Sequence, residues 1–220
     1  MMRRRKQGYK ALIAGGLLLL AAAFLLTGYN LLDTRRAGLA SQQVAEELKA
    51  VIPAASADTV EPPDPEPAEE TPSADDTEVE IPDYILNPDM EMPEIEIDGS
   101  AYIGLLEIPD LDLSLPVMSQ WSYDNLRLSP CRYSGSAYSG GLVIAGHNYR
   151  THFGPLDRLS PGAAVVFTDA DGNRFTYEVS ETEVLQPSDV PILMDDQWDL
   201  TLFTCTLDGQ ARFTVRCTLT

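Results

Sequence analysis

The stretch that decides the fold is Thr204–Arg212 (TCTLDGQAR), which joins two β-branched segments near the end of the 220-residue chain. Asp-Gly is a strong signal for a two-residue hairpin turn. If Asp208 and Gly209 form that turn, Cys205 lies directly opposite Arg212. Opposed residues of an antiparallel pair project to the same face, with Cβ atoms about 5 Å apart. The sequence therefore predicts a hairpin that holds a thiol beside a guanidinium.

This pairing has a chemical and a plain interpretation. Arginine stays protonated at any working pH, and a nearby cation favours the thiolate, which is the nucleophilic form of cysteine. The plain interpretation is a surface arginine that lies beside a half-buried cysteine. The rest of the chain has to decide between the two.

Short segments rich in β-branched and aromatic residues, separated by turn residues, surround the hairpin and are typical of strands. They are Tyr102–Ile108, Leu113–Met118, Gly141–Ala145, Ala163–Thr168, Arg174–Leu185, Leu200–Cys205 and Ala211–Leu219. Helical patterns are confined to Tyr123–Arg127 and Gly154–Leu159 within this region. About 120 residues with seven or more strands predict an all-β domain over residues 99–220, either a closed barrel or a sandwich.

Asp169–Asn173 connects two of these strands and faintly resembles a calcium-binding loop. Gly172 is at position four of such a loop rather than six, and Ser180 takes the place of the bidentate glutamate. We therefore expect a plain hairpin turn, and the sequence predicts no metal site and no cofactor.

The N-terminal part predicts a membrane anchor. Residues 1–10 form a basic tail, and the apolar run over residues 11–32 would span roughly 33 Å as a helix, enough for a bilayer core. Basic residues ahead of the run indicate a cytoplasmic N-terminus. A cleaved signal peptide is the alternative, but the run is long for one and no clear cleavage site follows it. We expect a single-pass protein of the cell membrane with an extracellular β-domain.

Two further segments connect the anchor to the β-domain. Residues 33–52 predict a weakly amphipathic juxtamembrane helix. Residues 53–98 contain nine prolines, sixteen acidic residues and no basic one, which predicts a disordered linker. The alternative is that residues 81–97 lie on the folded domain and cover a groove. The net charge of −19 argues against a nucleic-acid partner.

The chain has three cysteines, an odd number for a protein outside the cytoplasm. Cys217 and Cys205 point to opposite faces of the predicted hairpin, which disfavours a disulfide between them. A Cys131–Cys217 disulfide is one hypothesis, and two small buried hydrophobic residues are the other.

A thiolate nucleophile needs a proton donor for the leaving group, and histidine is the usual choice. The chain has two histidines, His147 and His152. His147 follows the apolar strand Gly140–Ala145 and Gly146, a position that is rigid on one side and open on the other. We expect His152 on the loop surface without a catalytic role.

At this point the chain resembles the sortase family. Thr201–Cys205 (TLFTC) is similar to the T-L-x-T-C signature, and Leu142–Asn148 (LVIAGHN) to the histidine segment. Residues 106–117, with I-P and L-P-V motifs, and residues 153–162 are similar to other family segments. The resemblance implies an eight-stranded sortase β-barrel and a membrane-anchored cysteine transpeptidase, of a B-like or D-like class.

By position, the resemblance makes Cys205 the nucleophile, His147 the general acid/base and Arg212 the oxyanion stabiliser. Arg216 is a rival for the last role, although the hairpin register places it two opposed pairs away, at about 13 Å. Our interpretation of the substrate-binding residues covers the neighbours of these groups and the 187–194 loop: Thr204, Asn148, Ile192 and Leu193. Ile192 and Leu193 are equally open to an interpretation as ordinary core. The Cys205–Arg212 turn is short for the family.

The implied reaction cleaves a Leu-Pro-x-Thr-Gly-like sorting motif of a secreted protein and transfers it to an amine. The acceptor would be a peptidoglycan precursor or a pilin lysine. Two other interpretations stay open: a cysteine peptidase that hydrolyses its substrate, and a non-catalytic anchored barrel that binds peptides or wall polymers.

Overall fold

The computed structural model describes residues 3–53, 81–194 and 197–220. Within these ranges nine strands form one sheet in the order β1-β2-β3-β4-β5-β8-β9-β7-β6. The strands are β1 (Ile95–Ile97), β2 (Ser100–Ile108), β3 (Leu113–Met118), β4 (Cys131–Ser136), β5 (Gly140–Ala145), β6 (Ala164–Asp169), β7 (Arg174–Leu185), β8 (Leu200–Cys205) and β9 (Arg212–Leu219). The α-helices are α1 (Arg3–Val51), α2 (Asp83–Leu86), α3 (Tyr123–Leu128) and α4 (Val190–Leu193), and the 3₁₀ helices are η1 (Pro109–Leu111), η2 (Gly154–Arg158) and η3 (Pro187–Asp189).

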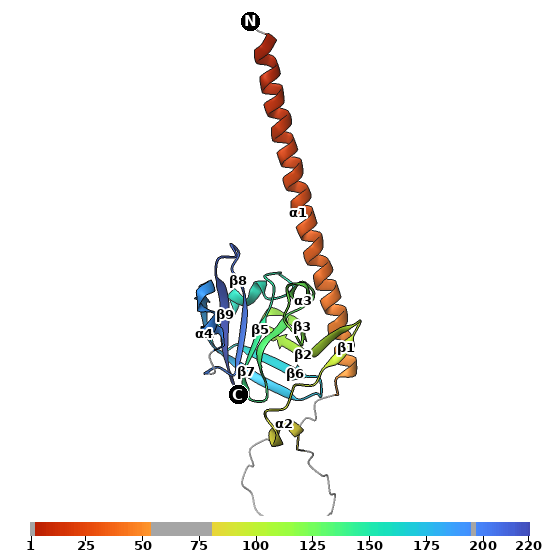
Figure 1. The fold of residues 1–220 in the computed structure, drawn as a ribbon, viewed down its shortest axis with the longest axis vertical. Helices are drawn as coiled ribbons and strands as arrows, with labels where there is room; N and C mark the ends of the chain where they lie inside the picture. Colours follow the sequence, from red (N-terminus) through yellow and green to blue (C-terminus); the bar gives the residue numbers. More distant parts are fainter. Residues whose placement is uncertain (1–2, 54–80, 195–196) are drawn as a thin grey trace, which may run out of the picture.

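The sheet closes because β2 pairs with both β3 and β6. Strands β2 to β9 therefore form the closed eight-stranded barrel that the family resemblance implies, and β1 adds a short ninth strand along β2 (Figure 1). Strand β4 was missed at the sequence level. Its serines and Gly135 interrupt the apolar pattern, and its pairing with β5 shifts register twice.

Alternate residues of the strands point into the barrel and form its core. The largest buried cluster includes Leu142 and Ile144 of β5 and Leu202 of β8. A second cluster lies on the other face of the same strands and joins Val143 with Phe203. Both faces of β5 and β8 are thus buried, which explains why their sequences are continuous apolar runs rather than alternating ones.

Helix α1 covers the predicted anchor and the predicted juxtamembrane helix without a break between them. Its C-terminal part packs on the barrel, where Leu48 is fully buried against Tyr102 and Met118. Its N-terminal part projects away from the barrel (Figure 1). Within the described ranges, no helix combines the length and the apolar character that crossing a membrane requires.

The predicted linker differs from expectation in its second part. Residues 54–80 lie outside the described residues, whereas residues 81–98 lie on the barrel. Tyr84 stacks on Tyr138 with 4.8 Å between ring centroids and 13° between planes. Met92 is 5% exposed and belongs to the main core. These aromatic and apolar anchors outweigh the acidic, proline-rich composition that indicated disorder.

The Asp169–Asn173 connection is a hairpin, as expected. Asp169 Oδ1 accepts hydrogen bonds from the backbone N–H groups of Asp171 and Asn173, at 3.0 and 2.8 Å. Its Oδ2 accepts from Tyr138 Oη at 2.7 Å and from Asn173 Nδ2 at 2.8 Å. Both carboxylate oxygens therefore stabilise the turn and its attachment to β4–β5.

Candidate active site

The β8–β9 hairpin has the predicted register, because Cys205 pairs with Arg212. The turn itself differs from the predicted two-residue turn. The Gly209 N–H donates to the Thr206 carbonyl at 2.8 Å, so Leu207 and Asp208 occupy the centre and Gly209 follows at a φ of +70°. Asp208 Oδ1 accepts from the Gln210 N–H and the Thr206 hydroxyl, which stabilises this wider turn.

His147 comes to the same level from the other side of β8. Strand β5 runs parallel to β8, with Ala145 paired to Phe203, and the Gly146 N–H donates to the Phe203 carbonyl at 2.9 Å. Continued by two residues, this register brings His147 level with Cys205. A side chain at Gly146 would meet the Phe153 ring at 2.2 Å, so this approach requires glycine.

The loop after His147 is held by its own backbone. The Phe153 N–H donates to the His147 carbonyl at 3.1 Å, and the Tyr149 carbonyl accepts from the N–H groups of His152 and Gly154. The Tyr149 ring lies face to face with the His147 imidazole, at 4.1 Å between centroids and 5° between planes. Tyr149 thus fixes the plane of the imidazole. Sequence reasoning missed it, because one aromatic residue in a polar loop carries no periodic signal.

The expectation that His152 lies on the surface is wrong. His152 is fully buried, and neither ring nitrogen has a hydrogen-bond partner among the described residues. Its ring lies 5.5 Å from the Tyr149 ring, which separates it from His147. Burial, reinforced by His147, lowers the pKa of His152 to about 4. His152 is therefore a neutral packing residue under the loop that carries His147.

Two arginines share the face of β9 on which Arg212 opposes Cys205. Arg212 is partly buried and donates from Nη1 to the Ala211 carbonyl at 3.0 Å. Arg216 pairs with Thr201, four residues farther along the hairpin, which is two pairs farther on the same face. It is fully buried, and its side chain is 1% exposed.

Every side-chain nitrogen of Arg216 is engaged. Nε donates to Glu183 Oε1 at 2.8 Å, and Nη1 donates to Thr201 Oγ1 at 2.9 Å. Nη2 donates to the Ile192 carbonyl at 2.7 Å, and Nη1 is 3.4 Å from the Leu193 carbonyl. Arg216 thus holds helix α4 onto the barrel. This position favours Arg212 as the arginine that acts beside Cys205.

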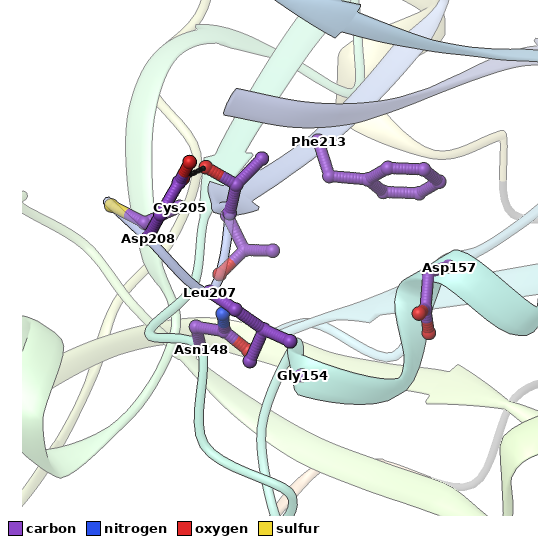
Figure 2. A pocket seen from close by; sticks show the side chains of 9 residues that line it. Asn148, Gly154, Asp157, Cys205, Leu207, Asp208 and Phe213 are labelled. Atoms are coloured by element: carbon purple, nitrogen blue, oxygen red, sulfur yellow. Dashed lines mark hydrogen bonds between the residues drawn. The ribbon is translucent and has the colours of Figure 1, made fainter. Parts of the chain in front are cut away.

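A cavity of about 450 Å³ lies next to Cys205 at the end of the barrel (Figure 2). Its lining comes from the β8–β9 turn, the loop after His147 and helix η2: Asn148, Gly154, Asp157, Thr204, Cys205, Thr206, Leu207, Asp208 and Phe213. Two of the four predicted substrate-binding residues, Asn148 and Thr204, therefore lie in its wall. Asp157 and Phe213 were not singled out from the sequence, because only the fold brings η2 next to the hairpin.

Ile192 and Leu193 do not line this cavity. Leu193 is 2% exposed and packs with Val143, Ala145 and Phe203, so the interpretation as core is the one that holds for it. Ile192 is 46% exposed. Its side chain lies on the surface of α4, over the same face of the hairpin as Arg216.

The other two cysteines are separate buried thiols, so the hypothesis of a Cys131–Cys217 disulfide is wrong. Cys217 lies in the main core, whereas Cys131 packs under α1. Burial raises the pKa of each thiol to about 12. Cys205, in contrast, is partly exposed at the edge of a cavity, where a nucleophile can meet a substrate.

Fold and site together define a closed β-barrel in which a thiol, an imidazole and a guanidinium lie on or just beyond three adjacent strands. The sortase domain model matches residues 106–220. The chain belongs to the sortase family.

Individual relatives agree with this assignment. Sortase D of Bacillus subtilis (strain 168) is 31% identical over 107 residues, which cover 46% of this chain and 53% of the relative. The chain thus matches about half the length of that protein. The crystal structure of sortase C1 from Streptococcus agalactiae is similar, with a TM-score of 0.50 and 26% identity over 57% of this chain and 70% of that chain. Clostridium perfringens sortase C has the same fold, with a TM-score of 0.50 and 23% identity over 59% of this chain and 73% of that one.

Proposed function

We propose that this protein is a cysteine transpeptidase that cleaves a Leu-Pro-x-Thr-Gly-like sorting motif and transfers the threonyl acyl group to an amine. The observation that carries the proposal is the position of Cys205 on the middle one of three adjacent strands. Arg212 is its paired neighbour on β9, and His147 follows β5 two residues after Ala145, whose partner Phe203 is two residues before Cys205.

In the first step, the Cys205 thiolate attacks the threonine carbonyl and forms the carbon–sulfur bond. Arg212 donates hydrogen bonds to the oxygen as it gains negative charge, a contribution often worth several kcal/mol. His147, as imidazolium, gives a proton to the departing glycine nitrogen while the carbon–nitrogen bond breaks. The products are a Cys205 thioester and a free amine.

In the second step, an amine acceptor attacks the thioester carbonyl. The new carbon–nitrogen bond forms, the carbon–sulfur bond breaks, and neutral His147 takes the proton that the amine loses. Cys205 and His147 return to their starting states. Water in place of the amine would give hydrolysis.

The acceptor in this proposal is an amine of a peptidoglycan precursor or of a pilin lysine, and the donor is a secreted protein with a C-terminal sorting motif. We place the catalytic barrel outside the cell membrane, with the apolar run of residues 11–32 as a single-pass anchor. Large apolar side chains in this part of α1, such as Leu18 and Phe24, are more than 70% exposed, and such a surface suits a lipid environment. Protease accessibility of the barrel on intact cells tests this orientation.

The experiment that tests the function incubates the full-length protein with a Leu-Pro-x-Thr-Gly peptide library, with and without an added primary amine. The expected result is an amide-linked product that depends on the amine and is absent with Cys205→Ala. Cleavage of equal rate and product with or without amine would identify a hydrolase instead. Peptide binding without cleavage, equal in wild type and Cys205→Ala, would identify a non-catalytic barrel.

A further inference from the structure

We propose that helix α1 positions the loop that carries His147, and that Gly38 and Thr151 are the positioning residues through which it does so. This inference rests on the proposed function, because it adds a support for the group that moves the proton. The loop lies beside the nucleophile, since Asn148 and Cys205 line the same cavity. Helix α1 runs along the barrel before it projects away from it (Figure 1).

Gly38 brings the backbone of α1 against the side chain of Thr151. A Cβ atom built at Gly38 would lie 2.7 Å from Thr151 Cγ2 and 3.0 Å from Thr151 Cβ. Ordinary contacts between carbon atoms are about 3.5–4.0 Å, so this approach requires glycine. Gly28 of the same helix has no such neighbour, because no described atom outside the helix lies within 4 Å of a Cβ atom built there. Gly38 is thus the glycine of this pair whose missing side chain lets α1 approach the loop.

The part of α1 beside the loop is fixed on the barrel along its length. Ser41, Ala45 and Leu48 lie on one face of the helix, and each is at most 3% exposed. Beyond the end of the helix, the Pro53 carbonyl oxygen lies 2.6 Å from the place of a Cβ atom at Gly172, in the β6–β7 turn. Helix α1 therefore has contacts with both ends of the barrel, and it can hold the loop in one place.

Two backbone hydrogen bonds connect Thr151 to the catalytic histidine. The Phe153 N–H donates to the His147 carbonyl at 3.1 Å, and the His152 N–H donates to the Tyr149 carbonyl at 3.0 Å. Both hydrogen bonds close turns that contain Thr151. The Tyr149 ring is in turn stacked on the His147 imidazole. A displacement of Thr151 therefore moves both the backbone and the ring that hold His147.

Among the described residues, side-chain packing rather than side-chain hydrogen bonding makes this contact. Thr151 Oγ1 and the Oγ of Ser41, one turn along α1 from Gly38, are buried without a hydrogen-bond partner in the described structure. Buried polar groups are nearly always hydrogen-bonded, and proteins accept exceptions mainly at functional sites. The position of the loop thus depends on the shapes of Gly38 and Thr151, which a single methyl group changes.

The first arm of the test adds one methyl group to α1. In full-length Gly38→Ala, the new Cβ atom must displace Thr151 by about 1 Å to reach an ordinary contact. A misplacement of about 1 Å can lower a rate about 100-fold, and the loop transmits part of this displacement to His147. We expect kcat for a sorting peptide to fall about tenfold, with KM within about twofold and a shifted pH–rate profile. Alanine is the better helix former, so we expect its gain to offset the displacement and leave the urea midpoint unchanged.

Gly28→Ala is the matched control, and it should keep kcat within about twofold of the wild type. Thr151→Val keeps the shape of the side chain without the unpartnered hydroxyl and should do the same. Gly38→Ala/Thr151→Ala removes the Cγ2 and Oγ1 atoms that the new methyl group meets, so it should be at least about threefold faster than Gly38→Ala. A wild-type kcat in Gly38→Ala, an equal loss in Gly28→Ala, or a double variant as slow as Gly38→Ala would overturn the proposal.

The second arm needs no sorting peptide. Amide hydrogen exchange of His152 and Phe153, the donors of the two loop hydrogen bonds, is compared in full-length Gly38→Ala and Gly28→Ala. We expect exchange at these amides to be at least about fivefold faster in Gly38→Ala, with unchanged exchange in β9. Equal exchange in the two variants would overturn the proposal. Failure of the wild type to form any acyl-enzyme would refute the proposed function, whereas the exchange arm would still decide whether α1 holds the loop.

Discussion

Each end of the β8–β9 hairpin has an arginine on the same face, but the two arginines differ in burial and in hydrogen bonding. At the Thr201–Arg216 end, the buried arginine uses all three side-chain nitrogens. At the Cys205–Arg212 end, the arginine is partly exposed and, among the described residues, donates one hydrogen bond. Near this second end the Thr204 hydroxyl has no partner within the part of the chain that the structure describes, and the same holds for the Thr214 hydroxyl midway along the hairpin.

The proposed function uses this difference to distinguish a structural arginine from a catalytic one. Satisfied buried polar groups stabilise a single arrangement, and unsatisfied ones lower stability unless a ligand completes them. Functional sites are where proteins commonly accept such a cost. Burial and partners thus distinguish the two arginines, although residue type and strand position do not.

The largest expected effect is on stability, at the Arg216 end. Arg216→Ala leaves Glu183 and two backbone carbonyls of α4 without their donor. Breaking a buried charge pair costs about 3–5 kcal/mol, and we expect the free energy of unfolding to fall by that amount in urea titrations. If Arg216→Ala kept wild-type stability and lost acyl-enzyme formation, the assignment of the two arginines would have to be reversed.

The matched substitution at the Cys205–Arg212 end, Arg212→Ala, should lower the rate of catalysis rather than the stability. Arg212→Ala removes the donor for the developing oxyanion, and losing one such donor lowers rates about 100- to 1,000-fold. We expect kcat/KM for a sorting peptide to fall by this factor while the free energy of unfolding changes by less than about 0.5 kcal/mol. Arg212→Lys keeps the charge without the fork and should recover only part of the rate. A large loss of stability in Arg212→Ala would contradict the division between the two ends.

The buried, unpartnered His152 predicts a pH dependence of stability. Its pKa is about 4 in the folded protein and near 6.5 when unfolded. Between pH 6.5 and pH 4 the unfolded chain therefore binds a proton at His152 that the native state does not bind. The free energy of unfolding should fall by about 1.4 kcal/mol per pH unit down to pH 4, roughly 3 kcal/mol in all, and should not depend on this group above pH 6.5. In His152→Phe the free energy of unfolding should no longer fall in this way between pH 6.5 and pH 4. An unchanged pH dependence would show that His152 does not cause it.

Tyr149 links His152 to the reactive end through its contact with His147. Tyr149→Leu removes a stacked ring pair worth about 0.5–1.5 kcal/mol. We expect up to about a tenfold lower kcat/KM, together with a shifted pH–rate profile, since the imidazole loses a fixed neighbour. Tyr149→Phe keeps the ring and serves as the control. A wild-type pH–rate profile in Tyr149→Leu would show that the stack does not position His147.

The smallest effect has the opposite sign. Thr204→Val replaces an unpartnered hydroxyl with a methyl group of similar shape. We expect the free energy of unfolding to rise by about 1 kcal/mol, measured by urea titration. A loss of stability in Thr204→Val would show that the hydroxyl already has a partner, such as a bound water.

Sequence patterns predicted the features of this molecule that depend on residues close together in the chain. The seven predicted strands follow from short β-branched and aromatic segments, and the Cys205–Arg212 register follows from one hairpin, whereas the choice of a closed barrel over a sandwich came from the family resemblance. The parts that depend on distant contacts were missed. Arg216 became distinguishable from Arg212 only once α4 packed over it, and His152 became buried only once the loop folded back on itself.

Amino-acid composition gave a wrong prediction for residues 81–98, and a dipeptide preference did not predict the shape of the turn after Cys205. Acidic, proline-rich residues 81–98 indicated disorder, yet a few apolar anchors such as Tyr84 and Met92 hold them on the barrel. The wider turn after Cys205 arises from hydrogen bonds to Asp208 that a dipeptide preference does not describe.

The central claim is that Cys205, between His147 and Arg212, forms a thioester with a sorting peptide. The most direct measurement is the intact mass of the full-length protein during reaction with a Leu-Pro-x-Thr-Gly peptide library, followed by mapping of the modified residue. We expect one added acyl group that ends in threonine, carried by Cys205, released by a primary amine and absent from Cys205→Ala. An acyl group on another residue, or cleavage that persists in Cys205→Ala, would contradict it.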